Sequence, residues 1–143
     1  MPVQLDPYLN FADGKAREAM EFYQSVFGGE LHVATFGEQP DFPGKDASHD
    51  DLVMHSQLGG GDHGLHLMAA DAVPGMAEPN AGSMQLSLSG DDETLLRGYW
   101  DRLLDGGSVT VPLDQAPWGD IFGMLTDRFG VPWMVNILGP DQG

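Results

Sequence analysis

The sequence predicts an α+β fold made of two βαβββ modules, and two observations support this prediction. First, an amphipathic helix is predicted over 14–27, where apolar residues recur at i, i+3, i+4 and i+7; it ends at Gly28-Gly29 and leads directly into a strand over 30–36. Second, the same apolar face returns 77 residues later and is again followed by a glycine pair, Gly106-Gly107, and a strand. Such internal similarity indicates two copies of one module. The matched apolar positions are Ala19, Phe22, Tyr23, Val26 and Phe27 in the first copy and Leu96, Tyr99, Trp100, Leu103 and Leu104 in the second.

The first module is predicted to contain four strands around its helix. The first strand, Val3 to Phe11, contains Pro7, which lacks a backbone N–H and therefore favours an edge position or a bulge. After the helix and the strand over 30–36, two more strands are predicted over 51–58 and 64–70. They are joined across a glycine-rich turn and form a hairpin.

The second module repeats this order. A strand over 83–89 precedes a helix that Asp91-Asp92 can cap, and a strand over 108–113 follows it. Two final strands are predicted over 119–126 and 131–138. The total of eight strands and two helices favours α+β over a doubly wound α/β fold.

Two segments without periodicity are interpreted as connections. Residues 37–51 are rich in proline, glycine and acidic residues and predict a surface loop that can act as a flap. Residues 73–82 have the composition of a linker. The chain is therefore expected to form one domain over 1–143, made of modules at 1–72 and 83–143.

Composition limits the classes of partner. The chain of 143 residues has 22 acidic and 6 basic residues, a net charge of −16, and no cysteine. Nucleic acid and anionic membranes would be repelled, and disulfide or thiolate chemistry is impossible. With no targeting segment or long apolar run, a cytoplasmic protein is expected. The acidic surface serves either solvation or a cationic partner.

Two sequence motifs extend this interpretation. They are FY-x3-FGG, beginning at Phe22, and W-G-D followed by D-x-F-G-V-P-W, ending at Trp133. Together with the βαβββ-βαβββ order, they resemble the vicinal oxygen chelate superfamily of glyoxalase, bleomycin-resistance and dioxygenase proteins, and within it the PhnB-like branch. The resemblance covers nearly the whole chain. It implies a curved mixed sheet around a cleft that binds a small molecule, and commonly a homodimer.

In metal-using members of that superfamily, four ligands come from the first and last strands of each module. The resemblance transfers those positions to the stretch from Tyr8 to Asn10, to His66, near Gln85 and to Asn136. Only His66 is a good ligand for Zn²⁺, Ni²⁺, Fe²⁺ or Mn²⁺, because neutral amides bind such ions weakly. No cofactor is therefore predicted, and a divalent metal at His66 is the alternative.

The histidines and aromatic residues supply the other candidates. His55 and His66 are predicted on adjacent strands with a common face, where they could act as acid and base, bind a ligand oxygen, or hold a metal with Asp62 or His63. Alternatively, either His55 or His66 is a hydrogen-bonded core histidine, and His63 is only a surface residue of the hairpin. Trp118 follows a proline and is a candidate pocket residue, whereas Trp133 and Phe129 are expected in the core or in a dimer interface.

The function favoured by these residues is small-molecule binding in the cleft without a strong metal site. The expected ligand-binding residues are Tyr8, Asn10, Gln85, Trp118 and Asn136, with His55 and His66 as the candidate catalytic pair. The alternative is a metal-dependent lyase, isomerase or oxygenase that acts on a substrate with vicinal oxygens. The sequence leaves open whether the protein is an enzyme.

Overall fold

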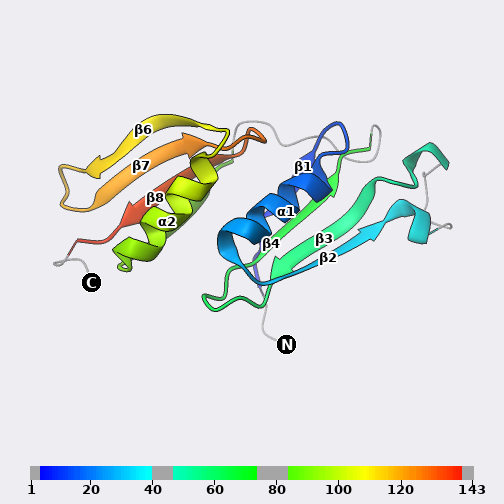
Figure 1. Cartoon of the computed structure of the whole chain (residues 1–143), viewed down its shortest axis with the longest axis horizontal. Coiled ribbons are helices and arrows are strands. Elements are labelled where there is room, and N and C mark those ends of the chain that lie inside the picture. The colour runs from blue at the N-terminus through cyan, green and yellow to red at the C-terminus, as the bar shows by residue number, and fades with distance from the viewer. Residues whose placement is uncertain (1–3, 40–46, 74–83, 140–143) are drawn as a thin grey trace. The chain divides into compact units, whose positions relative to one another are not determined.

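The computed structural model describes residues 4–39, 47–73 and 84–139, and it divides the chain into two compact units, Met1–Asn80 and Ala81–Gly143 (Figure 1). The unit boundary falls in the segment that the sequence predicts as a linker. Residues 74–82 of that linker and residues 40–46 of the predicted flap lie outside the described residues.

Unit 1 is a βαβββ module with a mixed four-stranded sheet. The strand order is β1-β4-β3-β2; β1 and β4 are parallel and the other neighbours antiparallel. Two short 3₁₀ helices, η1 (Phe36–Glu38) and η2 (Ala47–His49), lie between β2 and β3. The elements are β1 (Tyr8–Phe11), α1 (Ala16–Phe27), β2 (Glu30–Thr35), β3 (Val53–Gly59) and β4 (Leu67–Asp71).

Unit 2 repeats the topology of unit 1. Its strand order is β5-β8-β7-β6, again with one parallel pair, β5 and β8. The predicted fold class, α+β with two βαβββ modules and mixed sheets, is confirmed. The elements are β5 (Leu86–Gly90), α2 (Glu93–Leu104), β6 (Ser108–Gln115), β7 (Ile121–Thr126) and β8 (Pro132–Ile137).

Several strands begin later than the sequence predicts, and the largest differences with a local cause are those of β1 and β4. β1 begins at Tyr8 rather than Val3, because Pro7 cannot donate to the ladder, although its carbonyl accepts from Met68 N–H. β4 begins at Leu67 rather than Gly64, whose φ of +67° is incompatible with a strand. The prediction that the first strand lies at a sheet edge is confirmed for β1.

Each helix covers one face of its own sheet, and the core of each unit lies between the two layers (Figure 1). On α1 the buried residues recur with helical spacing, and on β1 and β8 they alternate with half-exposed ones, as the amphipathic pattern predicts. Trp133, predicted in the core, is buried on the helix side of β8. The core residues of α1 are Ala16, Ala19, Met20, Tyr23 and Val26, and those of α2 are Leu96, Tyr99, Trp100 and Leu103.

The glycine pair after α1 has a steric role. Gly28 has a φ of +75° and its N–H bonds to the carbonyl of Gln24, which ends the helix. A Cβ at Gly29 would lie only 2.6 Å from the carbonyl oxygen of Gly59, so β2 can start beside the end of β3 only with glycine there.

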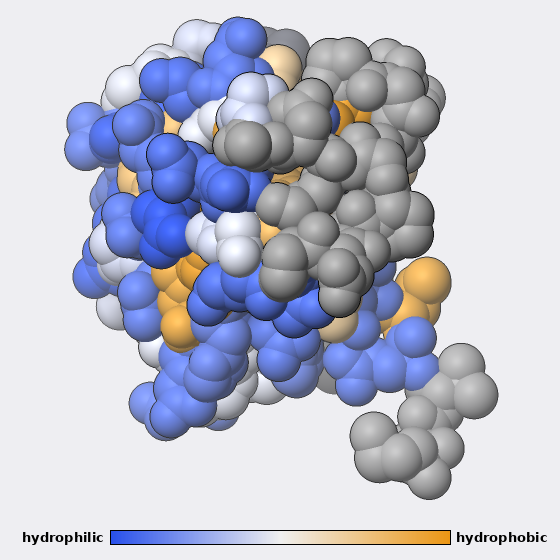
Figure 2. Space-filling view, turned by 90° about the vertical axis from the view of Figure 1, so that its right-hand side faces the viewer, coloured by the Kyte–Doolittle hydropathy of each residue, from blue (hydrophilic) through white to orange (hydrophobic). Residues whose placement is uncertain are grey.

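The chain is acidic, with a net charge of −16, and much of its surface is polar. The coloured part of the face in Figure 2 is mostly hydrophilic, with small apolar areas between the polar side chains. Both long helices contain 12 residues, and within 4–39, 47–73 and 84–139 there is no helix with the length and apolarity needed to span a bilayer.

A buried carboxylate joins three elements of unit 1. Asp71, at the end of β4, is 4% exposed; it accepts a hydrogen bond from Ala16 N–H at 2.9 Å and another from Val53 N–H at 2.7 Å. It thereby satisfies one donor in the first turn of α1 and one at the start of β3. The side chain of Asp71 fixes where the helix begins relative to the sheet.

Replacing Asp71 with alanine is expected to lower the free energy of unfolding by about 2–4 kcal/mol, because two buried N–H groups lose their charged acceptor. Urea denaturation followed by circular dichroism measures the loss. Asp91→Ala, at an exposed position, is the matched control and should change stability by less than about 0.5 kcal/mol. Equal stability of the two variants would contradict the role assigned to Asp71.

Candidate functional site

The sheet face of unit 1 that α1 does not cover holds a tyrosine–histidine pair. Tyr8 in β1 and His55 in β3 are partly buried, and the Tyr8 hydroxyl lies 2.9 Å from His55 Nδ1. Their rings also stack, with centroids 5.6 Å apart and planes inclined by 26°. Because β4 separates β1 from β3, the Tyr8 side chain must reach across β4 to meet His55.

Hydrogen-bond chemistry determines what this pair presents to a ligand. Burial raises the pKa of Tyr8, so the phenol remains protonated near neutral pH and can donate to Nδ1. A neutral imidazole that accepts at Nδ1 carries its proton at Nε2. In this state, the second nitrogen of His55 is a donor suited to a ligand oxygen.

His66 lies on the same sheet face but far from His55. A Cβ at Gly59 would be 2.9 Å from His66 Nδ1, so the imidazole packs over Gly59 at the far end of β3. Gly59 and His55 are four residues apart on that strand, a separation of about 13 Å. The two histidines share a face, as the sequence predicts, but they do not form one acid–base pair or one metal site within unit 1.

The described side chains do not assemble a metal-ligand set. Within the described parts of the chain, no group of three His, Asp, Glu or Cys residues lies close enough to hold one ion. His66 is exposed and His55 Nδ1 already bonds to Tyr8. His66 as a metal ligand remains a prediction.

The uncovered face of unit 2 holds an oriented amide. Asn136 in β8 donates from Nδ2 to Asp120 Oδ2 at 3.0 Å. Because a carboxylate can only accept, the amide nitrogen must face Asp120, and Asn136 Oδ1 is left as an acceptor. Asn10 occupies the uncovered face of unit 1, where it pairs in register with Ala70.

Asp120 is the site-positioning residue that sequence reasoning missed. It is 6% exposed, and its Oδ1 also accepts from Gly139 N–H at 2.9 Å. The bond from Gly139, then those from Asn136 and the Trp118 side chain, lower the pKa of Asp120 below its usual value near 3.8, although burial alone would raise it. The W-G-D motif contained this residue, but only the contacts show its role.

An exposed aromatic pair adjoins this amide. Trp118, which the sequence marks as a pocket residue, is 56% exposed and meets Phe122 of β7 edge to face, with centroids 5.6 Å apart. Phe122 is the register partner of Asn136. Gln85 is exposed directly before β5. Unit 2 therefore presents an aromatic surface with an amide acceptor beside it.

The chain matches the Glyoxalase/Bleomycin resistance protein/Dioxygenase superfamily over residues 6–135. It belongs to this superfamily, and the resemblance inferred from the sequence motifs is confirmed.

Similar proteins include PhnB-like members. The chain is 31% identical to Protein YjdN of Escherichia coli K12, covering 94% of this chain and 95% of that protein. The crystal structure of PA1353 from Pseudomonas aeruginosa is 37% identical, has a TM-score of 0.80 and is matched over 96% of this chain and 99% of that one. A structure described as a putative 3-demethylubiquinone-9 3-methyltransferase, PhnB protein, from Bacillus cereus is 26% identical, with a TM-score of 0.72 and coverage of 95% and 100%.

Asp120→Asn is expected to lower the melting temperature at neutral pH. The lowered pKa of Asp120 means that its charged carboxylate stabilises the folded state above pH 3.8. This contribution is lost as the pH falls through the pKa of the folded state, which lies below 3.8. The difference in melting temperature between wild type and Asp120→Asn should therefore be constant above about pH 5 and shrink below 3.8. Scanning calorimetry over this range measures it, with Asp91→Asn as the exposed control; a difference that does not change with pH would contradict the assignment.

Proposed function

We propose that the protein binds a small planar molecule with oxygen acceptors on the sheet faces that its helices leave uncovered. The observation that carries the proposal is the Tyr8–His55 pair, a phenol and an imidazole fixed at 2.9 Å on a partly buried face of the sheet. The stacked rings offer a flat apolar surface, and His55 Nε2 offers a donor for a carbonyl, carboxylate or other oxyanion.

The face of unit 2 supports the same class of ligand. The edge-to-face Trp118–Phe122 pair suits a planar group, and Asn136 Oδ1 suits an N–H or O–H donor. Because Asp120 already fixes the Asn136 amide, this side chain does not have to be ordered when the ligand binds. The entropic cost of binding is therefore smaller. These polar groups are few and already oriented, as is typical of small-molecule sites.

Binding is favoured over the two enzymatic alternatives. The described side chains gather no metal-ligand set within a unit, so no observation favours the metal-dependent lyase, isomerase or oxygenase. The methyltransferase activity in the description of the Bacillus cereus relative is not favoured either. The glycine-rich turn after β3 leads into β4 rather than into a helix, so it offers no helix N-terminus to a nucleotide-like cofactor.

Ligands of the proposed class should raise the melting temperature in a saturable way. A panel of aromatic carboxylates, aryl phosphonates and planar ketones is tested by thermal shift, and each compound that stabilises the protein is measured by calorimetric titration. Tyr8→Phe keeps the ring but removes the hydroxyl, so it should weaken binding about 2- to 10-fold; His55→Ala should weaken it more. His63→Ala, at the exposed hairpin, should have no effect.

Two results would overturn this proposal. One is the absence of stabilisation by any member of the panel; the other is equal weakening by His55→Ala and His63→Ala. Metal analysis of untagged protein is an independent check, because one ion retained per chain and lost in His66→Ala would favour the metal enzyme instead.

A homodimer is also part of the proposal, since proteins of this superfamily commonly pair. Light scattering after size exclusion is expected to give about twice the 15.4 kDa chain mass at micromolar concentration. A mass equal to one chain would contradict it.

A further inference from the structure

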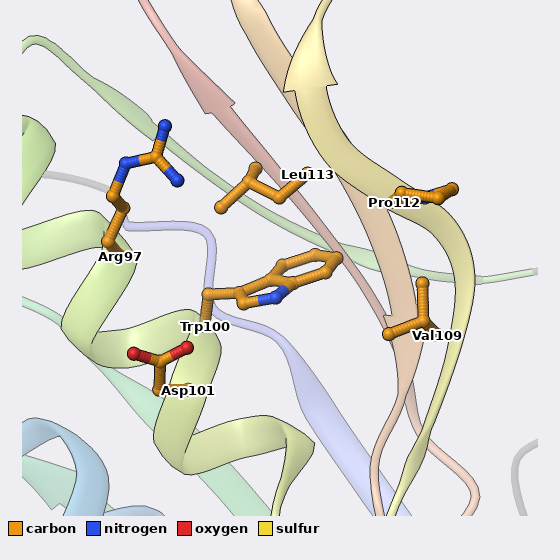
Figure 3. Close-up of a pocket in the computed structure, with 6 residues that line it drawn as sticks. All are labelled: Arg97, Trp100, Asp101, Val109, Pro112 and Leu113. Carbon is orange, nitrogen blue, oxygen red and sulfur yellow. The ribbon is translucent and has the colours of Figure 1, made fainter.

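A groove lies in unit 2 on the helix side of the sheet, away from the face that holds Asn136. It runs between α2 and the edge strand β6 and has a volume of about 450 Å³ (Figure 3). The lining residues are Arg97, Trp100 and Asp101 from α2 and Val109, Pro112 and Leu113 from β6. None of them belongs to the binding surfaces described above.

The groove exists because α2 does not cover β6. In unit 1, α1 packs against β2, β3 and β4, so the helix covers the edge strand β2. In unit 2, the main contacts of α2 are with β5 and β8. β6 is further displaced by irregular register between Val109 and Val111 and between Val111 and Asp114. The edge strand β6 therefore lies apart from α2.

The internal repeat shows which side chains changed to open this space. At the offset of 77 residues, Arg97 corresponds to Met20 and Asp101 corresponds to Gln24. Met20 is fully buried in the core of unit 1, whereas Arg97 and Asp101 are exposed. Where unit 1 has the buried apolar side chain of Met20, unit 2 thus has the charged side chain of Arg97 at the edge of the groove.

The two charges have opposite sign and lie one helical turn apart. Arg97 Nε bonds to Glu93 Oε2 at 2.7 Å, and the guanidinium has four further N–H donors on its terminal nitrogens. The i, i+4 spacing places the Cβ atoms of Arg97 and Asp101 about 6 Å apart. Figure 3 shows both side chains on the helix, with the Trp100 indole extending from it towards β6.

The opposite wall of the groove is apolar. Val109, Pro112 and Leu113 carry no charge, and Val109 is 45% exposed. Trp100 completes the apolar surface; it packs over Gly123, where a Cβ would come within 2.8 Å of the indole. The groove therefore combines a cationic group, an anionic group and an apolar wall.

We propose that this groove binds a free amino acid with a branched or aromatic apolar side chain. The ligand carboxylate bonds to Arg97, its ammonium group bonds to Asp101, and its side chain packs against Trp100 and Leu113. A purely anionic ligand is disfavoured by Glu93 and Asp101 beside the guanidinium. A strand added to β6 is disfavoured by Pro112, which removes a backbone donor, and by the bulges.

The test is a titration of uniformly ¹⁵N-labelled, full-length protein with L-phenylalanine and L-leucine up to about 10 mM, followed by two-dimensional NMR. Saturable shifts are expected in the amide signals of residues 97–101, 109–111 and 113. N-acetyl-L-phenylalanine amide, 3-phenylpropionate and phenethylamine lack one or both charges and should bind at least about tenfold more weakly, because each loses a charge-assisted hydrogen bond.

Matched variants locate the site. Arg97→Gln and Asp101→Asn should each weaken binding about tenfold, whereas Arg102→Gln removes a guanidinium from the same helix outside the groove and should leave the affinity within about twofold. Absence of shifts, equal binding of the blocked amide, or shifts centred on His55 or Asn136 would each overturn the proposal. Because the groove shares no residue with those surfaces, failure here leaves the proposed function intact.

Discussion

Among the described residues, each four-stranded sheet has a single α-helix to cover it, and this constraint shapes both units. A 12-residue helix is about 18 Å long and can bury one face of a sheet about 15–20 Å wide. The buried apolar residues of the strands therefore collect on that face. The opposite face stays partly exposed and carries the side chains that can meet a ligand, among them Tyr8, His55 and Asn136.

Buried carboxylates maintain this arrangement in a chain whose net charge is −16. Asp71 bonds to the first turn of α1 and the start of β3, and Asp120 bonds to Asn136 and Gly139. Asp127 accepts from Phe129 N–H, Val131 N–H and the Trp133 indole within the β7–β8 turn. In each case N–H donors satisfy the oxygens of the buried carboxyl group, and the side chain organises the local structure.

The two modules share a topology but differ in the chemistry of their surfaces. Unit 1 places a phenol and an imidazole on its uncovered face, and unit 2 places an aromatic pair and a fixed amide there. On the helix side, α1 packs against its edge strand β2, whereas α2 leaves a groove beside β6. Duplication thus supplied a common framework, and substitutions on both faces of the sheets made the two copies distinct.

The sequence by itself determined the order of elements, the α+β class, the apolar face of each helix and the glycine pairs after them. These features follow from local periodicity and backbone sterics, which act over a few residues. It also placed His55 and His66 on one face, because side chains alternate along a strand. Only tertiary structure decided that His55 meets Tyr8, 47 residues away, while His66 lies about 13 Å along the strand. It likewise decided that Asp120 fixes Asn136. Such contacts depend on which strands become neighbours and in what register, and these are properties of the whole sheet that no local pattern encodes.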